Sequence, residues 1–109
     1  MIDGLWTVEF HGPVGVGGGV VVFIKGQVLG GDSGYAYNGS YELKDNILKA
    51  RVSVNNFNSG LPNVFGIPGD FDLLVEGKMQ GDAISGTGAL AKAPDSKIVV
   101  RLKKSADLK

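Results

Sequence analysis

Apolar and polar residues alternate along much of this chain with the period of a β-strand. Near the start, Trp6, Val8 and Phe10 occupy every second position, with polar residues between them. Further along, Phe71 and Leu73 repeat the same pattern. Because successive side chains of a strand point to opposite faces of its sheet, each of these segments is predicted to be a half-buried strand.

The alternation, together with the turn residues between the segments, predicts eight strands. They are expected at about residues 5–11, 20–25, 28–29, 35–43, 47–55, 71–75, 80–91 and 97–103. The glycine-rich stretch Val14–Gly19 is expected to be a hairpin loop. Asn38–Gly39 leaves the local structure open: it is either a tight two-residue turn, or a bulge or glycine bend inside one long strand.

Short antiparallel strands with one apolar face each predict an all-β fold, an eight-stranded antiparallel β-barrel, because closure removes exposed strand edges. A β-sandwich is the alternative. Gly86 and Gly88 favour the barrel, since glycine relieves crowding where a strand bends. The length of 109 residues is that of a single domain, expected over residues 1–104 and followed by a frayed tail over residues 105–109.

The longest irregular segment is Asn56–Pro68. One short helical turn is expected within it, at Leu61–Gly66, because a proline lies near its start and a glycine at its end. The segment is also rich in apolar residues, which either cap the core or form a contact surface for another protein. These residues are Phe57, Leu61, Val64, Phe65 and Ile67.

The inward faces of the strands supply an apolar barrel interior, which is either filled by its own side chains or able to hold a small apolar ligand. The residues expected there include Trp6, Val8, Phe10, Phe71 and Leu73. In a closed barrel the first and last strands are neighbours. Arg101 is therefore predicted to stack on Trp6 and lock the closure, the alternative being an ordinary core aromatic and a surface charge.

Charge and composition narrow the possible partners. The chain has 11 basic and 11 acidic residues, so there is no basic excess to hold a nucleic-acid backbone. Cysteine is absent, which agrees with a reducing compartment. We see no signal peptide, and the longest apolar run, Val20–Ile24, is too short for a membrane helix. A cytoplasmic protein that does not bind membranes is expected.

Residues capable of catalysis are sparse. His11 is the only histidine, and without cysteine a typical zinc site or a Cys–His pair cannot be assembled. Asp70 and Asp72 could share one face of a strand at a spacing used in glycoside hydrolysis, but their alternation with apolar residues indicates that they face water. We therefore expect no enzyme activity, no metal site and no cofactor.

Several short motifs resemble known families. Gly4-x-Trp6 in the first strand, with an arginine in the last, resembles the lipocalin superfamily pattern. A closer resemblance, over about residues 3–75, is to the GrlR family, negative regulators of bacterial type III secretion. The matching segments are Asp3-Gly4, Ile24-Lys25, Gly30-Gly31-Asp32, Tyr37-x-Gly39, Ile47-Leu48, Leu61-Pro62-Asn63-Val64, Ile67 and Asp70-Phe71-Asp72-Leu73.

The resemblance implies a lipocalin-like barrel that forms a homodimer and has no enzyme activity. It also implies that the protein binds and sequesters a helix-turn-helix transcriptional activator, which represses type III secretion genes. A carrier of a small apolar ligand is the alternative from a different class, and a barrel domain within a larger assembly is a third.

The resemblance also indicates a partner-binding turn, at which this chain departs from the family. The family presents four acidic residues at one strand turn, and the matching positions here are Leu43, Lys44, Asp45 and Asn46. Only Asp45 is acidic, with Glu42 beside it. Glu42 and Asp45, together with the apolar residues Phe57, Leu61, Val64 and Phe65, are the candidate partner-binding residues.

Overall fold

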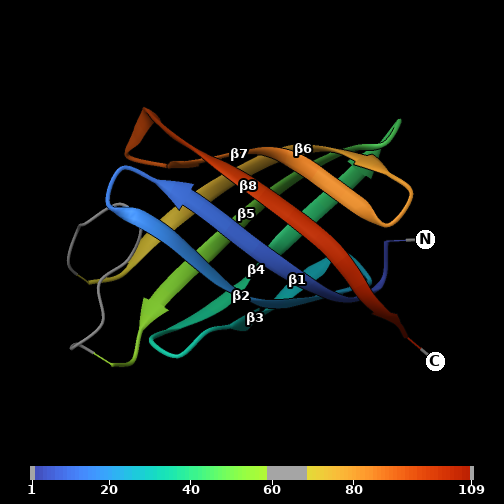
Figure 1. Ribbon diagram of the computed structural model, residues 1–109, viewed down its shortest axis with the longest axis horizontal. Helices are drawn as coiled ribbons and strands as arrows, with labels where there is room; N and C mark the ends of the chain where they lie inside the picture. The colour runs from blue at the N-terminus through green and yellow to red at the C-terminus, as the bar shows by residue number, and fades with distance from the viewer. Residues whose placement is uncertain (1, 59–68, 109) are drawn as a thin grey trace.

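The computed structural model describes residues 2–58 and 69–108, which form a closed antiparallel barrel (Figure 1). Each strand pairs with the next, and the last pairs with the first, so the predicted barrel is confirmed and the sandwich is not. The strands are β1 (Gly4–Gly12), β2 (Gly15–Ile24), β3 (Gln27–Gly31), β4 (Tyr35–Lys44), β5 (Ile47–Asn56), β6 (Phe71–Gln80), β7 (Ala83–Leu90) and β8 (Ala93–Asp107).

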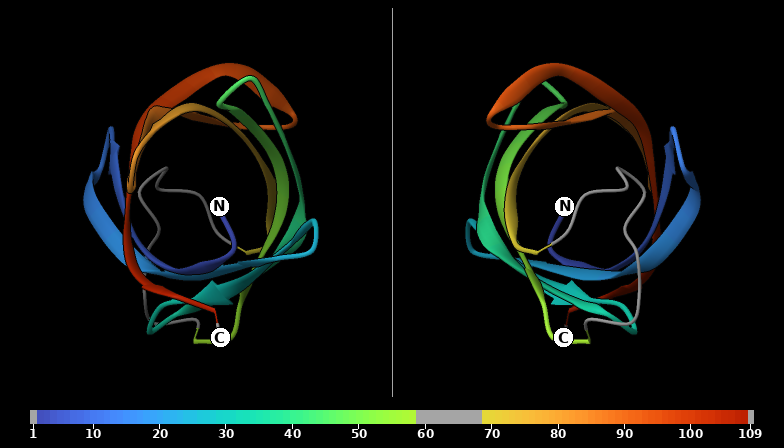
Figure 2. Two further views of the ribbon diagram at one scale, coloured as in Figure 1. Left: turned by 90° about the vertical axis from the view of Figure 1, so that its right-hand side faces the viewer. Right: turned by 90° about the vertical axis from the view of Figure 1, so that its left-hand side faces the viewer.

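The strands encircle a central space in Figure 2, and the apolar side chains of the core lie on the inner side of this ring. Every strand contributes alternate, inward-facing apolar side chains to this core, as the period of two predicts. Trp6 is fully buried and meets Phe23 edge to face, with ring centroids 5.9 Å apart. Phe23 in turn meets Tyr41 at 5.1 Å. Such edge-to-face pairs add about 0.5–1.5 kcal/mol each beyond the burial of their area.

The glycine-rich hairpin loop expected at Val14–Gly19 is wrong. Gly15–Gly19 form the first half of β2 and pair residue by residue with β1, and only Pro13 and Val14 make the turn. The glycines concealed this strand because they carry no side chains and so give no alternation of apolar and polar positions. The ladder with β1 needs only their backbone groups.

Asn38–Gly39 lies inside β4, so the hairpin alternative is wrong, and the pairing with β3 and β5 continues through both residues without a bulge. A Cβ atom at Gly39 would lie 2.0 Å from the carbonyl oxygen of Arg51. Glycine is required here because the backbones of β4 and β5 approach closely.

Several strand ends differ from the predictions, and β8 begins at Ala93 rather than at residue 97. Gln80 ends β6 and does not begin the next strand, because the chain turns at Gly81, whose φ of 61° suits glycine. The tail expected to fray after residue 104 instead continues β8 to Asp107. Pairing with the start of β1 holds it, since Asp107 lies opposite Gly4.

Asn56, expected in the loop, is the last residue of β5. The helical turn expected at Leu61–Gly66 lies outside the described residues.

Candidate functional site: partner-facing surfaces and the barrel interior

The turn between β4 and β5 carries the candidate acidic residues. Asp45 and Asn46 have φ values of 54° and 64°, the left-handed conformation that a tight two-residue hairpin of type I′ requires at both positions. Glu42 is exposed on the outer face and lies opposite Lys49. Lys49 also pairs with Glu76 of β6 at 3.7 Å. Positive and negative charges are thus mixed at this end of the barrel.

Phe57 lies beyond the last residue of β5, with 64% of its surface exposed. Its backbone N–H donates to the carbonyl of Gly34 at 3.0 Å, which fixes its position beside the β3–β4 connection. Because β5 has 10 residues, Phe57 lies about 33 Å along the strand from the Asp45 turn. The two candidate regions therefore do not form one site. Leu61, Val64 and Phe65 lie outside the described residues.

An apolar outer surface on β2 and β3 was missed by the sequence analysis. Val16, Val20, Val22, Ile24 and Leu29 point outward from these two strands, and we call this set the β2–β3 face. Val16, Val20 and Leu29 are 67%, 46% and 44% exposed, and neither strand contains a charged residue. Alternate valines on β2 could have revealed this face, but the loop predicted there concealed it.

The barrel interior contains a cavity of about 50 Å³. Of the residues expected inside, Val8, Phe10 and Leu73 line it, whereas Trp6 and Phe71 do not. Phe71 is partly buried and packs against Tyr35. Ligand pockets usually measure about 300–1,000 Å³, so the cavity is far smaller than a pocket for a fatty acid. The remaining lining residues are Val21, Phe23, Val28, Tyr37, Leu48, Ala50, Val52, Val54, Val75, Val100 and Leu102.

The N-terminal residues Ile2 and Asp3 are fixed by hydrogen bonds from the side chains of Trp6 and Tyr41. The Trp6 Nε1–H donates to the carbonyl of Ile2 at 2.8 Å, and the Tyr41 hydroxyl donates to Asp3 at 2.7 Å. The bond from Tyr41 and a second bond from the Lys25 backbone N–H lower the pKa of Asp3. Burial, followed by the contact with Asp3, raises the pKa of Tyr41.

The predicted stacking of Arg101 on Trp6 is wrong, although β1 and β8 are neighbours as expected. Arg101 is exposed on the outer face opposite Glu9, whereas Trp6 points inward. The cation near the indole is Lys104, whose Nζ lies 6.0 Å from the ring centroid and whose side chain is 8% exposed. Lys104 lies opposite Trp6 across the β1–β8 ladder, in the same register that sets Arg101 opposite Glu9, and the one-residue shift comes only between Trp6 and Leu5. Sequence alone does not reveal which residues of the two strands lie opposite each other.

Tyr37 and Asp32 form a polar contact at the edge of the core. The Tyr37 hydroxyl donates to Asp32, and the other Asp32 oxygen accepts the backbone N–H groups of Gly34 and Tyr35 at 2.8 and 2.9 Å. Burial, and next the bond to Asp32, raises the pKa of Tyr37 well above its ordinary value. Asp32 thus shapes the β3–β4 connection and anchors the tyrosine.

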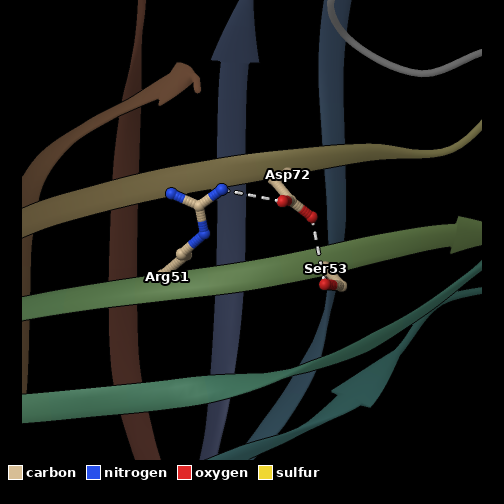
Figure 3. Close-up of polar contacts among 3 residues, drawn as sticks. All are labelled: Arg51, Ser53 and Asp72. Carbon is tan, nitrogen blue, oxygen red and sulfur yellow. Dashed lines mark hydrogen bonds and ion pairs between the residues drawn. The ribbon is translucent and has the colours of Figure 1, made fainter. Parts of the chain in front are cut away.

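Asp70 and Asp72 serve separate local contacts. On the outer face, Asp72 accepts hydrogen bonds from Arg51 at 2.9 Å and Ser53 at 3.0 Å (Figure 3). The Arg51 bond is the main reason that the pKa of Asp72 is lowered. Asp70 instead accepts the backbone N–H of Asn56 at 2.7 Å. These contacts stabilise the pairing of β5 with β6 and the ends of the loop that joins them.

No protein family and no curated protein sequence matches this chain. Within residues 2–58 and 69–108, no three His, Asp or Glu side chains gather in a way that could hold a metal ion. In the same ranges, no helix has the length and apolar character needed to cross a membrane.

Proposed function

We propose that this protein is a non-enzymatic, cytoplasmic regulator that binds and sequesters a helix-turn-helix transcriptional activator and thereby represses type III secretion genes. The resemblance to the GrlR family suggests the activity and the partner. The observation that carries the proposal is the β2–β3 face, where exposed aliphatic side chains occupy two uncharged strands. Depletion of charge and exposure of apolar side chains mark the centres of protein interfaces.

Sequestration requires a contact surface and no reaction chemistry, so a rigid barrel with an apolar outer face is sufficient for it. A homodimer is part of the same proposal. The mixed charge around Glu42 and Asp45 leaves the β4–β5 turn with little electrostatic attraction for a basic DNA-binding domain. We therefore assign the main contact with the activator to apolar surfaces and a secondary contact to this turn.

The test is co-purification of the tagged protein with a candidate helix-turn-helix activator from its own cells, with a secretion-gene reporter measured in parallel. Val20→Asp on the β2–β3 face should abolish both co-purification and repression. Leu74→Asp is the matched control, since Leu74 is also an outward aliphatic residue, 37% exposed, but lies on β6. Equal behaviour of the two variants, with both still folded, would contradict the assignment.

The second candidate function, a carrier of a small apolar ligand, rests on the cavity lined by Val8, Phe10 and Leu73. Its volume of about 50 Å³ limits it to ligands much smaller than a fatty acid. We place this function second for that reason.

A further inference from the structure

The two halves of β2 differ in their neighbours. β2 has 10 residues and β3 has 5, and β3 pairs only with Val20–Ile24. Gly15–Gly19 pair with β1 on one side, and none of the described strands pairs with them on the other. In Figure 1 the tip of the β1–β2 hairpin and the β3–β4 connection diverge at the left of the barrel. Among the described strands the barrel is closed, yet half of β2 has no strand partner on this side.

The register identifies which backbone groups lie on this edge. Gly12 and Gly15 flank the two-residue turn, so they form a hydrogen-bonded pair, and every second pair after them is hydrogen-bonded as well. Gly17 and Gly19 therefore bond to β1. The N–H and C=O groups of Val16 and Gly18 point away from β1, toward the side that β3 does not reach.

The edge lacks the features that normally protect such edges. Lysine, proline and β-bulges blunt the free edges of natural sheets. Residues 15–19 include neither lysine nor proline, and their pairing with β1 has no bulge. The exposed Val16 projects beside the edge. On β1, the neighbouring outward side chains of Glu9 and His11 bond to each other.

The edge ends at Gly19. A Cβ atom there would lie 2.7 Å from the carbonyl oxygen of Gly31 and 3.3 Å from the Asp32 Cβ, so the β3–β4 connection already packs against this residue. The free portion is thus Gly15–Gly18, long enough for a strand of about four residues that exchanges up to about four hydrogen bonds with Val16 and Gly18.

We propose that this edge of β2, Gly15–Gly18, binds an extended segment of a partner protein as an added strand. Unpaired strand groups select an extended backbone, and the aliphatic Val16 selects a β-branched or aliphatic residue beside it. Because Glu9 and His11 are paired with each other, an uncharged segment suits the site. The occupant is thus an uncharged, extended segment of a partner protein with a β-branched or aliphatic residue beside Val16, and this assignment does not depend on the identity of the activator.

A second copy of this chain is a poorer occupant. An added strand extends the sheet sideways and leaves its outer face uncovered, so two barrels joined here would touch over about four residues of each edge. Stable interfaces bury about 1,200–2,000 Å² in total, far more than such an edge provides. A single extended segment of a partner is bound instead as a peptide strand, whose affinity comes mainly from its backbone hydrogen bonds.

Amide hydrogen exchange of the labelled full chain tests the edge in the absence of a ligand. The Val16 and Gly18 amides should exchange at least about tenfold faster than those of Gly17 and Gly19, which bond to β1. Protection of Val16 and Gly18 equal to that of Gly17 in dilute protein would overturn the proposal, because the edge would already be covered. Protection that appears only as the protein concentration rises would overturn it in favour of a second copy.

Titration with the capped, uncharged peptide Thr-Val-Thr-Val-Thr tests the added strand. Saturable protection of Val16 and Gly18, at least about tenfold, is expected, and the same peptide with a central proline should give none. Val16→Pro removes the outward N–H, which makes no bond to β1, and should abolish peptide binding, while Val16→Ala keeps that N–H and should retain it. If the proline variant does not fold, Val16→Lys, an edge-blocking change, serves in its place. Peptide binding that is retained in the folded Val16→Pro or Val16→Lys variant would refute the site.

Discussion

Gly86 and Gly88 occupy successive inward positions on β7 but meet different surroundings. At Gly86, an added Cβ atom would lie 2.0 Å from the carbonyl oxygen of Glu76 and 2.4 Å from the Cα of Gly77. At Gly88, its nearest neighbours are side chains, Val100 Cγ2 at 3.1 Å and Leu73 Cδ1 at 3.4 Å. Gly86→Ala must therefore separate two backbones, whereas Gly88→Ala only shifts side chains that line the cavity.

The size of the difference follows from these distances. Restoring a contact of about 3 Å at Gly86 requires β6 and β7 to move apart by about 1 Å, which breaks the local ladder and disturbs the packing beneath it. We expect the Gly86→Ala variant to lose about two backbone hydrogen bonds, at about 1 kcal/mol each, and to need repacking that costs about 1–3 kcal/mol. Together these effects should destabilise the fold by about 3–5 kcal/mol. At Gly88 the extra methyl group shifts only the ends of side chains, and the reduced freedom of the unfolded chain offsets that cost by about 0.4–1 kcal/mol.

Thermal and urea unfolding of the two variants beside the parent protein measure this difference. A loss of about 3 kcal/mol should lower the Tm of Gly86→Ala by about 12 °C, while the Tm of Gly88→Ala should stay within about 4 °C of the parent. Equal stabilities of the two variants would refute the argument that backbone approach, rather than general crowding, requires glycine in β7.

Three further predictions concern closure, pH and the interior. Lys104→Ala should destabilise the fold by about 1–2 kcal/mol, because it removes the cation and the buried stem beside Trp6, while Arg101→Ala should change stability by less than about 0.5 kcal/mol in urea titrations. The folded-state pKa of Tyr37 is raised above its ordinary value of 10.0. The protonated hydroxyl therefore stabilises the folded state fully below about pH 10, and this stabilisation is lost as the pH rises through the raised pKa. The free energy of unfolding should fall more steeply above pH 10 in the parent than in Tyr37→Phe, and equal slopes would exclude this linkage. A fluorescent fatty acid should show no saturable binding, since the cavity holds about 50 Å³, and tight binding would show that the interior opens.

The fold was predictable because its information is local. Alternation at positions such as Trp6, Val8 and Phe10 places the strands, and the turns between them require an antiparallel arrangement. The glycine-rich half of β2 was not predictable in this way. Gly15–Gly19 read as a loop because a strand without side chains gives no periodic signal, although its ladder with β1 holds it in place.

The candidate site was less predictable because it depends on register and strand length. Arg101 and Lys104 both lie on β8, and the register of the pairing with β1 decides which of them lies beside the indole, because it sets Lys104 opposite Trp6 and Arg101 opposite Glu9. Asp45 and Phe57 both looked suitable for binding, but β5 separates them by its whole length. The edge of β2 exists because β3 is short, and no single residue indicates that.

The length of β2 is difficult to explain by the stability of the barrel alone. Its first half has glycines at its inward positions Gly15, Gly17 and Gly19, so it buries little apolar surface. None of the described strands pairs with the backbone groups of Val16 and Gly18 that point away from β1. The same half exposes Val16, and the second half exposes Val20 on the same outer face. A segment that adds little to the core, keeps free strand groups and carries exposed aliphatic residues has the composition of a binding surface. Partner binding through β2 accounts for all three properties together.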